Sequence, residues 1–408
     1  MQQSFNNIFR HPRIFPLLVW QFLNSWAPWV GIMMIYLNRY LQLSFSQIML
    51  LQSIFMFSNA ILEIPTGILG DKFGRKLSVL ISEILFAIGF SFYLFKAPLI
   101  FYALGELLMG MGRAFGSGSD EALQYDTFKE LKLEKFYTKF ISFQRSIVLS
   151  ASLLSGIFGT WALSSGLSMR FLWVTTPILL LISIVILIFF IKEPKVKLEK
   201  ELVPDYKAYL KSAFKTLKES KPLRAMVIIG FLLGIMRYTL NWSIQPLFLY
   251  FGVPLKYFTA IILTATSLTA ILLHQIILKK KIKLNFYTIT NILLAINLGF
   301  VLVLLFLKLT PGLKLLLIIA FIIQRVTNQE LMQIARSFWQ PFIKSFNRAT
   351  VLSGISLLNT MLFATINLFW GRLLDISVYW SVVITFFMLS TITWIYNFKN
   401  RKSLIEKK

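Results

Sequence analysis

Charged and amide side chains occur at helical spacing inside segments of the chain that are otherwise apolar. Residues three or four positions apart share one face of a helix, so each set forms a polar stripe. A charged group at the centre of a bilayer costs about 2.5–3.5 kcal/mol on insertion scales, and it therefore faces a bundle interior or water. The stripes are Gln21, Asn24, Ser25 and Trp29; Glu106 and Arg113; Arg237, Asn241 and Gln245; and Arg325, Gln329, Met332 and Arg336.

Two interpretations of these stripes are open. They could line one hydrophilic cavity shared by two halves of the molecule, or they could only make hydrogen bonds between neighbouring helices. We expect the cavity, because every third apolar segment carries a stripe.

Acids inside the apolar segments could carry protons: Glu63, Glu83, Glu106 and Glu330. Burial favours the neutral form of a carboxyl and a nearby arginine favours its charged form, so a pair that rearranges can take up and release a proton. The strongest candidate is Glu106 with Arg113, two turns away on the same face. Glu63 and Glu83 could instead make structural pairs near the ends of their helices.

Arginines in the predicted cavity could bind an anionic or zwitterionic solute, because a guanidinium binds carboxylate and phosphate groups through paired hydrogen bonds. Arg113, Arg237 and Arg325 slightly outweigh the glutamates there. Aromatic residues make up 15% of the chain. Three tryptophans on or near the stripes would suit flat apolar ligands: Trp29, Trp242 and Trp339.

Several other functions are excluded by composition. The chain has no cysteine, and His11 and His274 are its only imidazoles, so a disulfide, a thiol nucleophile or a metal centre is not expected. We expect no cofactor. The net charge of +25 is spread in short clusters between apolar runs, which indicates membrane topology and not nucleic-acid binding.

The elements that must position these residues are membrane-spanning helices. The chain of 408 residues is 57% hydrophobic, and its mean hydropathy is +0.70. A spanning helix needs about 20 mostly apolar residues. Twelve segments qualify, which predicts an all-α membrane protein: 16–38, 47–70, 76–95, 98–119, 139–163, 168–191, 223–250, 255–278, 285–307, 313–335, 349–372 and 377–397.

Charge divides these segments into two halves. Lys and Arg concentrate in alternate connections, which predicts that both termini are cytoplasmic and that the protein lies in the plasma (inner) membrane. The first apolar run lacks a cleavage site and is expected to be retained. We predict a six-helix half over 1–191, a cytoplasmic linker over 192–222 with a basic amphipathic helix, and a second six-helix half with a basic tail over 223–408.

The turn Gly67-Ile68-Leu69-Gly70-Asp71-Lys72-Phe73-Gly74-Arg75-Lys76 joins the second and third segments. It resembles the signature that members of the major facilitator superfamily carry at this position, with Lys72 where that pattern usually has arginine. The resemblance implies the fold of that family, with two six-helix halves whose first, fourth, seventh and tenth helices line the substrate path. It also implies a conformational latch at this turn, formed by Gly67, Asp71, Gly74 and Arg75 with Asp126 or Glu121 as the acid that pairs with the arginine.

Other stretches resemble a bacterial branch of that family that is grouped with multidrug efflux proteins. They are Glu63–Gly67, Asp120–Asp126 and Arg348–Ser353, while Arg113–Gly118 resembles the family's Arg-x-x-x-Gly element with its glycines displaced. The Gly-Pro motif of proton-coupled drug antiporters is missing from the fifth segment, which makes drug antiport less secure.

The leading hypothesis is therefore a secondary transporter of a small organic solute that works by alternating access, with proton-coupled efflux as its expected mode. No nucleotide-binding loop is found, so an ion or solute gradient must drive it. The alternative is an uptake symporter or exchanger for an anionic or zwitterionic metabolite. A more distant alternative is a membrane-embedded enzyme acting on lipids. We expect a monomer in the lipid bilayer.

Overall fold

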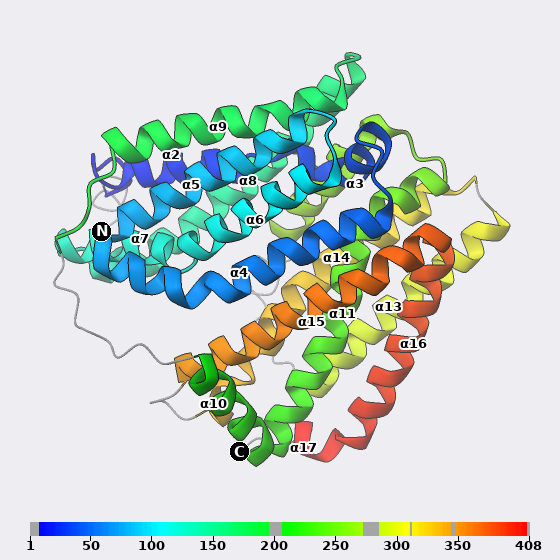
Figure 1. Ribbon diagram of the computed structural model, residues 1–408. Helices are drawn as coiled ribbons and strands as arrows, with labels where there is room; N and C mark the ends of the chain where they lie inside the picture. Colours follow the sequence, from blue (N-terminus) through cyan, green and yellow to red (C-terminus); the bar gives the residue numbers. More distant parts are fainter. Residues whose placement is uncertain (1–7, 196–205, 272–284, 311, 344–347, 406–408) are drawn as a thin grey trace. The chain divides into compact units, whose positions relative to one another are not determined.

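The structure, a computed structural model, describes residues 8–195, 206–271, 285–310, 312–343 and 348–405 (Figure 1). Within these ranges nearly every residue belongs to a helix or a short turn between helices. Ten of the described helices are long and apolar enough to cross a membrane. The predicted fold class, an all-α membrane protein, is confirmed.

Contacts within the chain define two compact units. The N-terminal unit comprises Met1–Leu43 and Leu50–Val203, and the C-terminal unit comprises Ser44–Met49 and Pro204–Lys408. The first contains α2 (Phe15–Ser25), α3 (Met33–Ile35), most of α4 (Phe45–Phe73), α5 (Arg75–Ser91), α6 (Leu99–Gly116), α7 (Ser119–Glu130), α8 (Tyr137–Ser164) and α9 (Met169–Phe189). The second contains α10 (Tyr206–Glu219), α11 (Lys221–Tyr250), α13 (Phe286–Leu309), α14 (Lys314–Ser337), α15 (Arg348–Ile376), α16 (Val378–Lys399) and α17 (Arg401–Ile405).

The first predicted span, 16–38, is not one continuous helix. Helix α2 ends at Ser25, and a 3₁₀ turn (Pro28–Gly31) precedes α3. Proline disfavours the helical conformation of the residue before it, and Ala27 accordingly has a non-helical backbone. The N–H of Ala27 donates to the Ser155 Oγ on α8 at 3.1 Å. A neighbouring helix thus satisfies a backbone group that the break exposes, as a membrane interior requires.

The eighth predicted span, 255–278, is described only in part. An apolar helical stretch covers Leu255–Ile271 and contains a π-helical segment at Ala260–Ala265. Residues 272–284, which include the end of this span and His274, lie outside the described residues.

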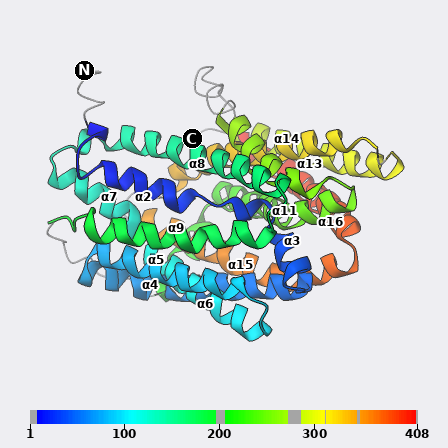
Figure 2. The ribbon, with the colours of Figure 1, turned by 90° about the horizontal axis from the view of Figure 1, so that it is seen from above.

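In the N-terminal unit the helices pack as neighbouring layers. Helix α5 packs against α6 and α9, and α2 packs against α8 and α9, as Figure 2 shows. Helices α4 and α6 approach unusually closely at Gly110. A Cβ atom added there would lie 2.6 Å from both the Phe55 carbonyl oxygen and the Ser58 Cβ. Small residues permit such approaches between membrane helices.

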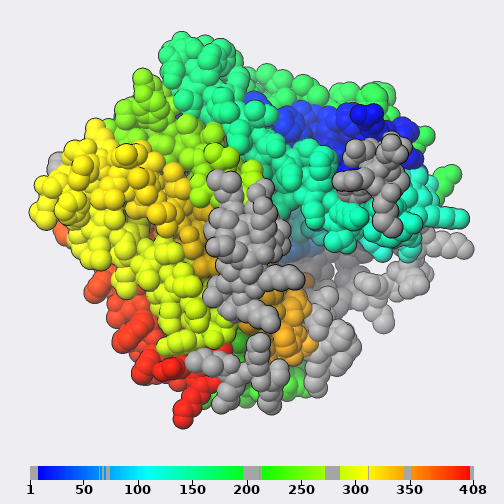
Figure 3. All heavy atoms as spheres, turned by 180° about the vertical axis from the view of Figure 1, so that it is seen from behind, coloured from blue at the N-terminus to red at the C-terminus, as the bar shows by residue number. Residues whose placement is uncertain are grey.

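In the C-terminal unit α11 is the most buried long helix, and it contacts α14, α15 and α16. Helices α13 and α14 pack side by side and form the yellow surface in Figure 3. Helix α10 lies within the predicted linker, 192–222, and packs against α15 and α11. The first residues of α4 also belong to this unit: Asp375, near the end of α15, accepts hydrogen bonds from the backbone N–H groups of Phe45 at 2.8 Å and Ser46 at 3.0 Å.

Candidate functional site

A cavity of about 370 Å³ lies within the C-terminal unit. Three helices, α11, α14 and α15, supply most of its walls, and the turn after α14 supplies the rest. The lining residues are Gly230, Phe231, Gly234, Arg237, Gln329, Met332, Gln333, Arg336, Trp339, Gln340, Leu352, Ile355, Ser356, Asn359 and Phe363. The volume is within the range of about 300–1,000 Å³ that small-molecule sites occupy.

Helical periodicity explains why these residues meet. On α14, Gln329, Gln333 and Arg336 follow one another at steps of four and three and so share one face. On α15, Ser356 and Asn359 are three apart and face the same space. Polar groups from separate apolar helices thus converge on one cavity within the C-terminal unit, and Arg237 and Gln329 from the predicted stripes are among them.

The three arginines near this cavity differ in their contacts. Arg237 and Arg336 line the cavity, and neither makes a hydrogen bond or ion pair with any side chain that the structure describes. Arg325 is partly buried, donates a hydrogen bond to the Asn241 Oδ1, and places its guanidinium 5.9 Å from the Phe321 ring centroid. Arg237 is close enough to both other arginines for their like charges to interact.

Arg325 and Asn241, which the sequence predicts to face a cavity shared by the two halves, are not among the residues that line this cavity. The two hold each other across α11 and α14. Gln245, one turn beyond Asn241, is buried and also lies outside the lining. Glu330, a predicted proton carrier, is buried on α14 at 4% exposure, and it too lies outside the lining.

In the N-terminal unit Glu83 is held by neutral donors. Its Oε1 accepts from the Trp20 Nε1 at 3.2 Å and from the Asn24 Nδ2 at 2.6 Å. The Asn24 Oδ1 in turn accepts from the Ser183 Oγ at 3.1 Å. The other carboxyl oxygen, Oε2, is buried and has no hydrogen-bond partner among the described residues. Asn24 is therefore tied to an acid on α5.

Glu106 has a similar environment on α6. Its Oε1 accepts from the Tyr93 hydroxyl at 2.6 Å and from the Gln52 Nε2 at 2.9 Å, and its side chain is 4% exposed. Arg113, its predicted partner, is exposed two turns further along α6 and is not among the groups that bond the carboxyl. The observed partners come from the neighbouring helices.

The remaining residues of the first stripe do not share one helical face. Because α2 ends at Ser25, the four-residue spacing does not carry on to Trp29. Trp29 packs instead against Phe90 and Trp173, with ring centroids 5.0 Å apart in each case. The Ser25 hydroxyl donates to the Gln21 carbonyl at 2.7 Å.

The predicted latch is described in part. The surroundings of Gly67 and the side chain of Asp71 are not among the described parts of the structure. Gly74 has φ +108°, a backbone conformation that side chains disfavour, and it precedes α5 directly. Arg75 is near enough to Asp126 for their charges to interact, which favours Asp126 over Glu121 as the acid of the latch. Glu63 is exposed and accepts from the Ser117 Oγ at 3.3 Å.

A carboxylate that the sequence did not single out caps the helix after this turn. Glu193, just after α9, accepts from the backbone N–H groups of Arg75 at 2.8 Å and Lys76 at 2.7 Å. A negative group at the N-terminus of a helix satisfies free N–H groups and interacts favourably with the helix dipole. Its position between Lys192 and Pro194, after an apolar run, is the only signal in the sequence.

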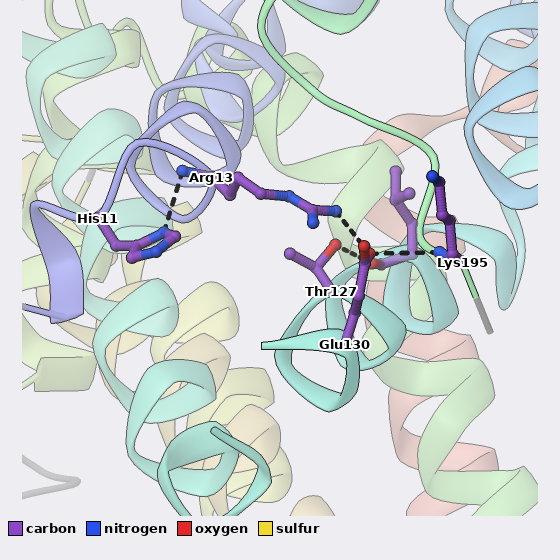
Figure 4. A network of polar contacts seen from close by, with 6 residues as sticks. His11, Arg13, Thr127, Glu130 and Lys195 are labelled. Carbon is purple, nitrogen blue, oxygen red and sulfur yellow. Dashed lines mark hydrogen bonds and ion pairs between the residues drawn. The ribbon is translucent and has the colours of Figure 1, made fainter. Parts of the chain in front are cut away.

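A second polar network joins the N-terminal segment to the same region (Figure 4). Arg13 forms an ion pair with Glu130, at the end of α7, over 2.8 Å between Nη2 and Oε2. The backbone N–H of Lys195 donates to the same oxygen at 3.2 Å. The His11 Nδ1 accepts from the backbone N–H of Arg13 at 3.2 Å. These contacts hold the segment around Arg13 and the start of the predicted linker on the N-terminal unit.

Sequence reasoning missed the contribution of α15 to the cavity. Leu352, Ser356, Asn359 and Phe363 repeat at steps of four, three and four, which is the same signal that identified the other stripes. The sequence analysis also missed Gln333 on α14 and Gln340 in the turn after it. Arg336 stood in a predicted stripe, although it was not singled out as a site residue.

Comparison with known proteins agrees with this fold. The family model of the Major Facilitator Superfamily matches residues 14–328. The chain belongs to the Major Facilitator Superfamily. No curated protein matches the chain significantly.

Similar solved structures are transporters. They include a mutant form of the nucleoside transporter NupG (TM-score 0.74, 14% identity, 95% of this chain and 99% of that chain covered). A POT family transporter in complex with 5-aminolevulinic acid has a TM-score of 0.72 at 13% identity, with 97% of this chain and 96% of that chain covered. A bacterial homologue of the human lysosomal transporter Spinster has a TM-score of 0.69 at 16% identity, covering 97% of this chain and 98% of that chain. The chain is thus a multi-pass membrane protein with a transporter fold.

Proposed function

We propose that this chain is a secondary active transporter that binds a small organic solute in the cavity of its C-terminal unit and moves it by alternating access of its two halves. The observation that carries the proposal is the convergence of Arg237, Gln329 and Asn359 from three apolar helices on one cavity of about 370 Å³. Polar groups in membrane helices are costly unless they serve a path or a partner. The family assignment favours this function over a membrane-embedded lipid enzyme.

Protons are the proposed coupling ion. Glu83 and Glu106 are buried, and each carboxyl is bonded through Oε1 by two neutral donors. Without a bonded cation such a carboxyl can accept a proton when the surroundings dry and release it when water enters. Glu106 remains our first candidate for the carrier, with Glu83 second.

Direction and orientation are also proposals. The resemblance of Glu63–Gly67 and Asp120–Asp126 to efflux-type facilitators favours export, and the distribution of Lys and Arg favours cytoplasmic termini in the plasma membrane. One transporter of similar fold is named for nucleosides and another is described in complex with 5-aminolevulinic acid, so the fold does not select the solute. The second candidate, uptake or exchange of an anionic or zwitterionic metabolite, is supported by the two arginines that line the cavity without a bonded acid among the described residues. We expect a monomer to be the working unit.

Counterflow in proteoliposomes tests the proposal. Vesicles containing the purified full-length protein are loaded with members of a panel of anions, cations and zwitterions, and entry of the same labelled compound is measured. We expect saturable counterflow for at least one compound, and acceleration when a pH gradient is imposed. Absence of counterflow across the whole panel, with correctly folded protein, would contradict a transport function.

A further inference from the structure

The cavity contains positive charge without a bonded negative counterpart. Arg237 on α11 and Arg336 on α14 both line it, and their charges interact with each other. Neither guanidinium contacts a carboxylate among the residues that the structure describes. The lining between them is neutral, with amide and hydroxyl groups from Gln329, Asn359 and Ser356. Two like charges facing one space in a membrane protein are unfavourable unless an anion or water compensates them.

Arg325 has a different role from these two. Its guanidinium bonds Asn241 and stacks near the Phe321 ring, and it is not part of the lining. We therefore assign Arg325 to holding α11 and α14 together. The sequence grouped Arg325 with Arg237 among the arginines that could bind a solute, whereas Arg336 is the arginine that lines this cavity together with Arg237.

The cavity wall also offers apolar surface beside the two cations. The aromatic side chains Phe231, Trp339 and Phe363 line it. The Trp339 ring fills the space beside Gly230, where an added Cβ would lie 3.1 Å from the ring. Aromatic side chains give flat contact surfaces for an apolar ligand body. Charge at one place and aromatic surface beside it define an amphipathic ligand.

We propose that Arg237 and Arg336 together bind the anionic group of the transported solute, a carboxylate or phosphate, while Phe231, Trp339 and Phe363 pack against an aromatic or apolar body. This proposal rests on the proposed transport function, whose substrate class it names. Guanidinium groups suit both kinds of anion because their donors match two oxygen acceptors at once.

Direct binding to the full-length protein in nanodiscs tests it. The probes are 2-naphthoate, 2-naphthyl phosphate and the neutral analogue 2-naphthamide, measured by titration calorimetry. The two anions distinguish a carboxylate site from a phosphate site. We expect Arg237→Gln and Arg336→Gln each to weaken the preferred anion about tenfold to hundredfold, the range for loss of a charged hydrogen bond, and to change binding of the amide much less.

Matched variants make the result specific. Arg336→Lys keeps the charge but loses the planar fork, so it should restore part of the affinity. Arg224→Gln, an exposed position on α11 outside the cavity lining, should leave all three probes unchanged. Arg325→Gln should weaken the anions and the amide by similar factors, because it loosens the walls. Thermal melting of each variant shows whether it is folded.

Three outcomes would overturn the proposal: no binding of either anion by the wild type at millimolar concentration, equal losses for anion and amide in Arg237→Gln and Arg336→Gln, or no loss in either variant. Counterflow on the same preparations separates this from the transport function. Counterflow of some compound that is independent of both arginines rejects the anion site and leaves transport standing. Arginine-dependent binding without counterflow of any compound rejects transport and leaves the anion site standing.

Discussion

In the N-terminal unit the buried acids Glu83 and Glu106 are bonded by neutral donors from neighbouring helices, whereas in the C-terminal unit Arg237 and Arg336 face a cavity and bond no described side chain. Neutral donors stabilise a carboxylate less strongly than a bonded cation would. The arginines lack, among the described residues, the partner that a charge in a membrane protein requires. The difference suggests a division of labour, with proton binding in the first unit and solute binding in the second.

The two units also differ in how closely their helices pack at glycine. At Gly110 in the N-terminal unit a Cβ would meet the backbone of α4, at 2.6 Å from the Phe55 oxygen. At Gly234 in the C-terminal unit an added Cβ would meet only the end of the Phe363 ring, at 3.3 Å. Gly234 and Phe363 both line the cavity. The first glycine permits helix contact, while the second leaves room for a ligand.

The largest expected effect is the loss of stability on adding a methyl group at Gly110, compared with the same change at Gly234. Gly110→Ala should destabilise the protein by about 1–3 kcal/mol, the usual cost of overpacking where backbone must move. Gly234→Ala should be close to neutral in stability, because alanine favours the helix and a ring end can shift, but it should weaken solute binding. Thermal melting and ligand titration of both variants check this. A lower melting temperature for Gly234→Ala than for Gly110→Ala would break the comparison.

The next effect concerns the acids. Glu106→Gln should abolish accumulation driven by a proton gradient and spare exchange at equilibrium, because the amide resembles the protonated carboxyl and its oxygen can still accept from Tyr93 and Gln52. Accumulation and exchange are measured in the same proteoliposomes. Glu83→Gln is the matched variant, since its carboxyl is held in the same way. If both variants still accumulate solute uphill, the proton carrier must be Glu63, Glu330 or a group other than these four glutamates.

The helical class and the positions of most spans followed from apolar length alone, because a membrane imposes about 20 apolar residues per crossing. The break at Trp26 and Ala27 was predictable in principle from Pro28, which interrupts helical geometry. The π-helical segment at Ala260–Ala265 has no comparable signal in the sequence.

The sequence predicted which site residues share a face of one helix. It did not predict which side chains from different helices contact one another. Periodicity placed Arg237 and Gln329 on the faces that line the cavity. It could not show that Arg325 bonds Asn241 on another helix, or that Tyr93 and not Arg113 reaches Glu106. Glu193 is distant in sequence from the helix that it caps, so no spacing rule connects it to Arg75. Partners from separate helices need the folded structure.

The smallest expected effect tests whether a half-buried ion pair behaves differently from these buried groups. Arg13 and Glu130 are 20% and 25% exposed, and water and salt weaken such a pair. A double-mutant cycle with Arg13→Gln and Glu130→Gln should give a coupling of about 0.2–1 kcal/mol that falls at high salt. Glu130→Gln alone should cost more than Arg13→Gln, because the Lys195 N–H also bonds this carboxylate. Unfolding measured at low and high salt gives the coupling, and solute affinity should stay constant throughout. A coupling that exceeds this range and is insensitive to salt, or a change in solute affinity, would show that the pair takes part in the transport cycle and does not merely fasten the N-terminal segment.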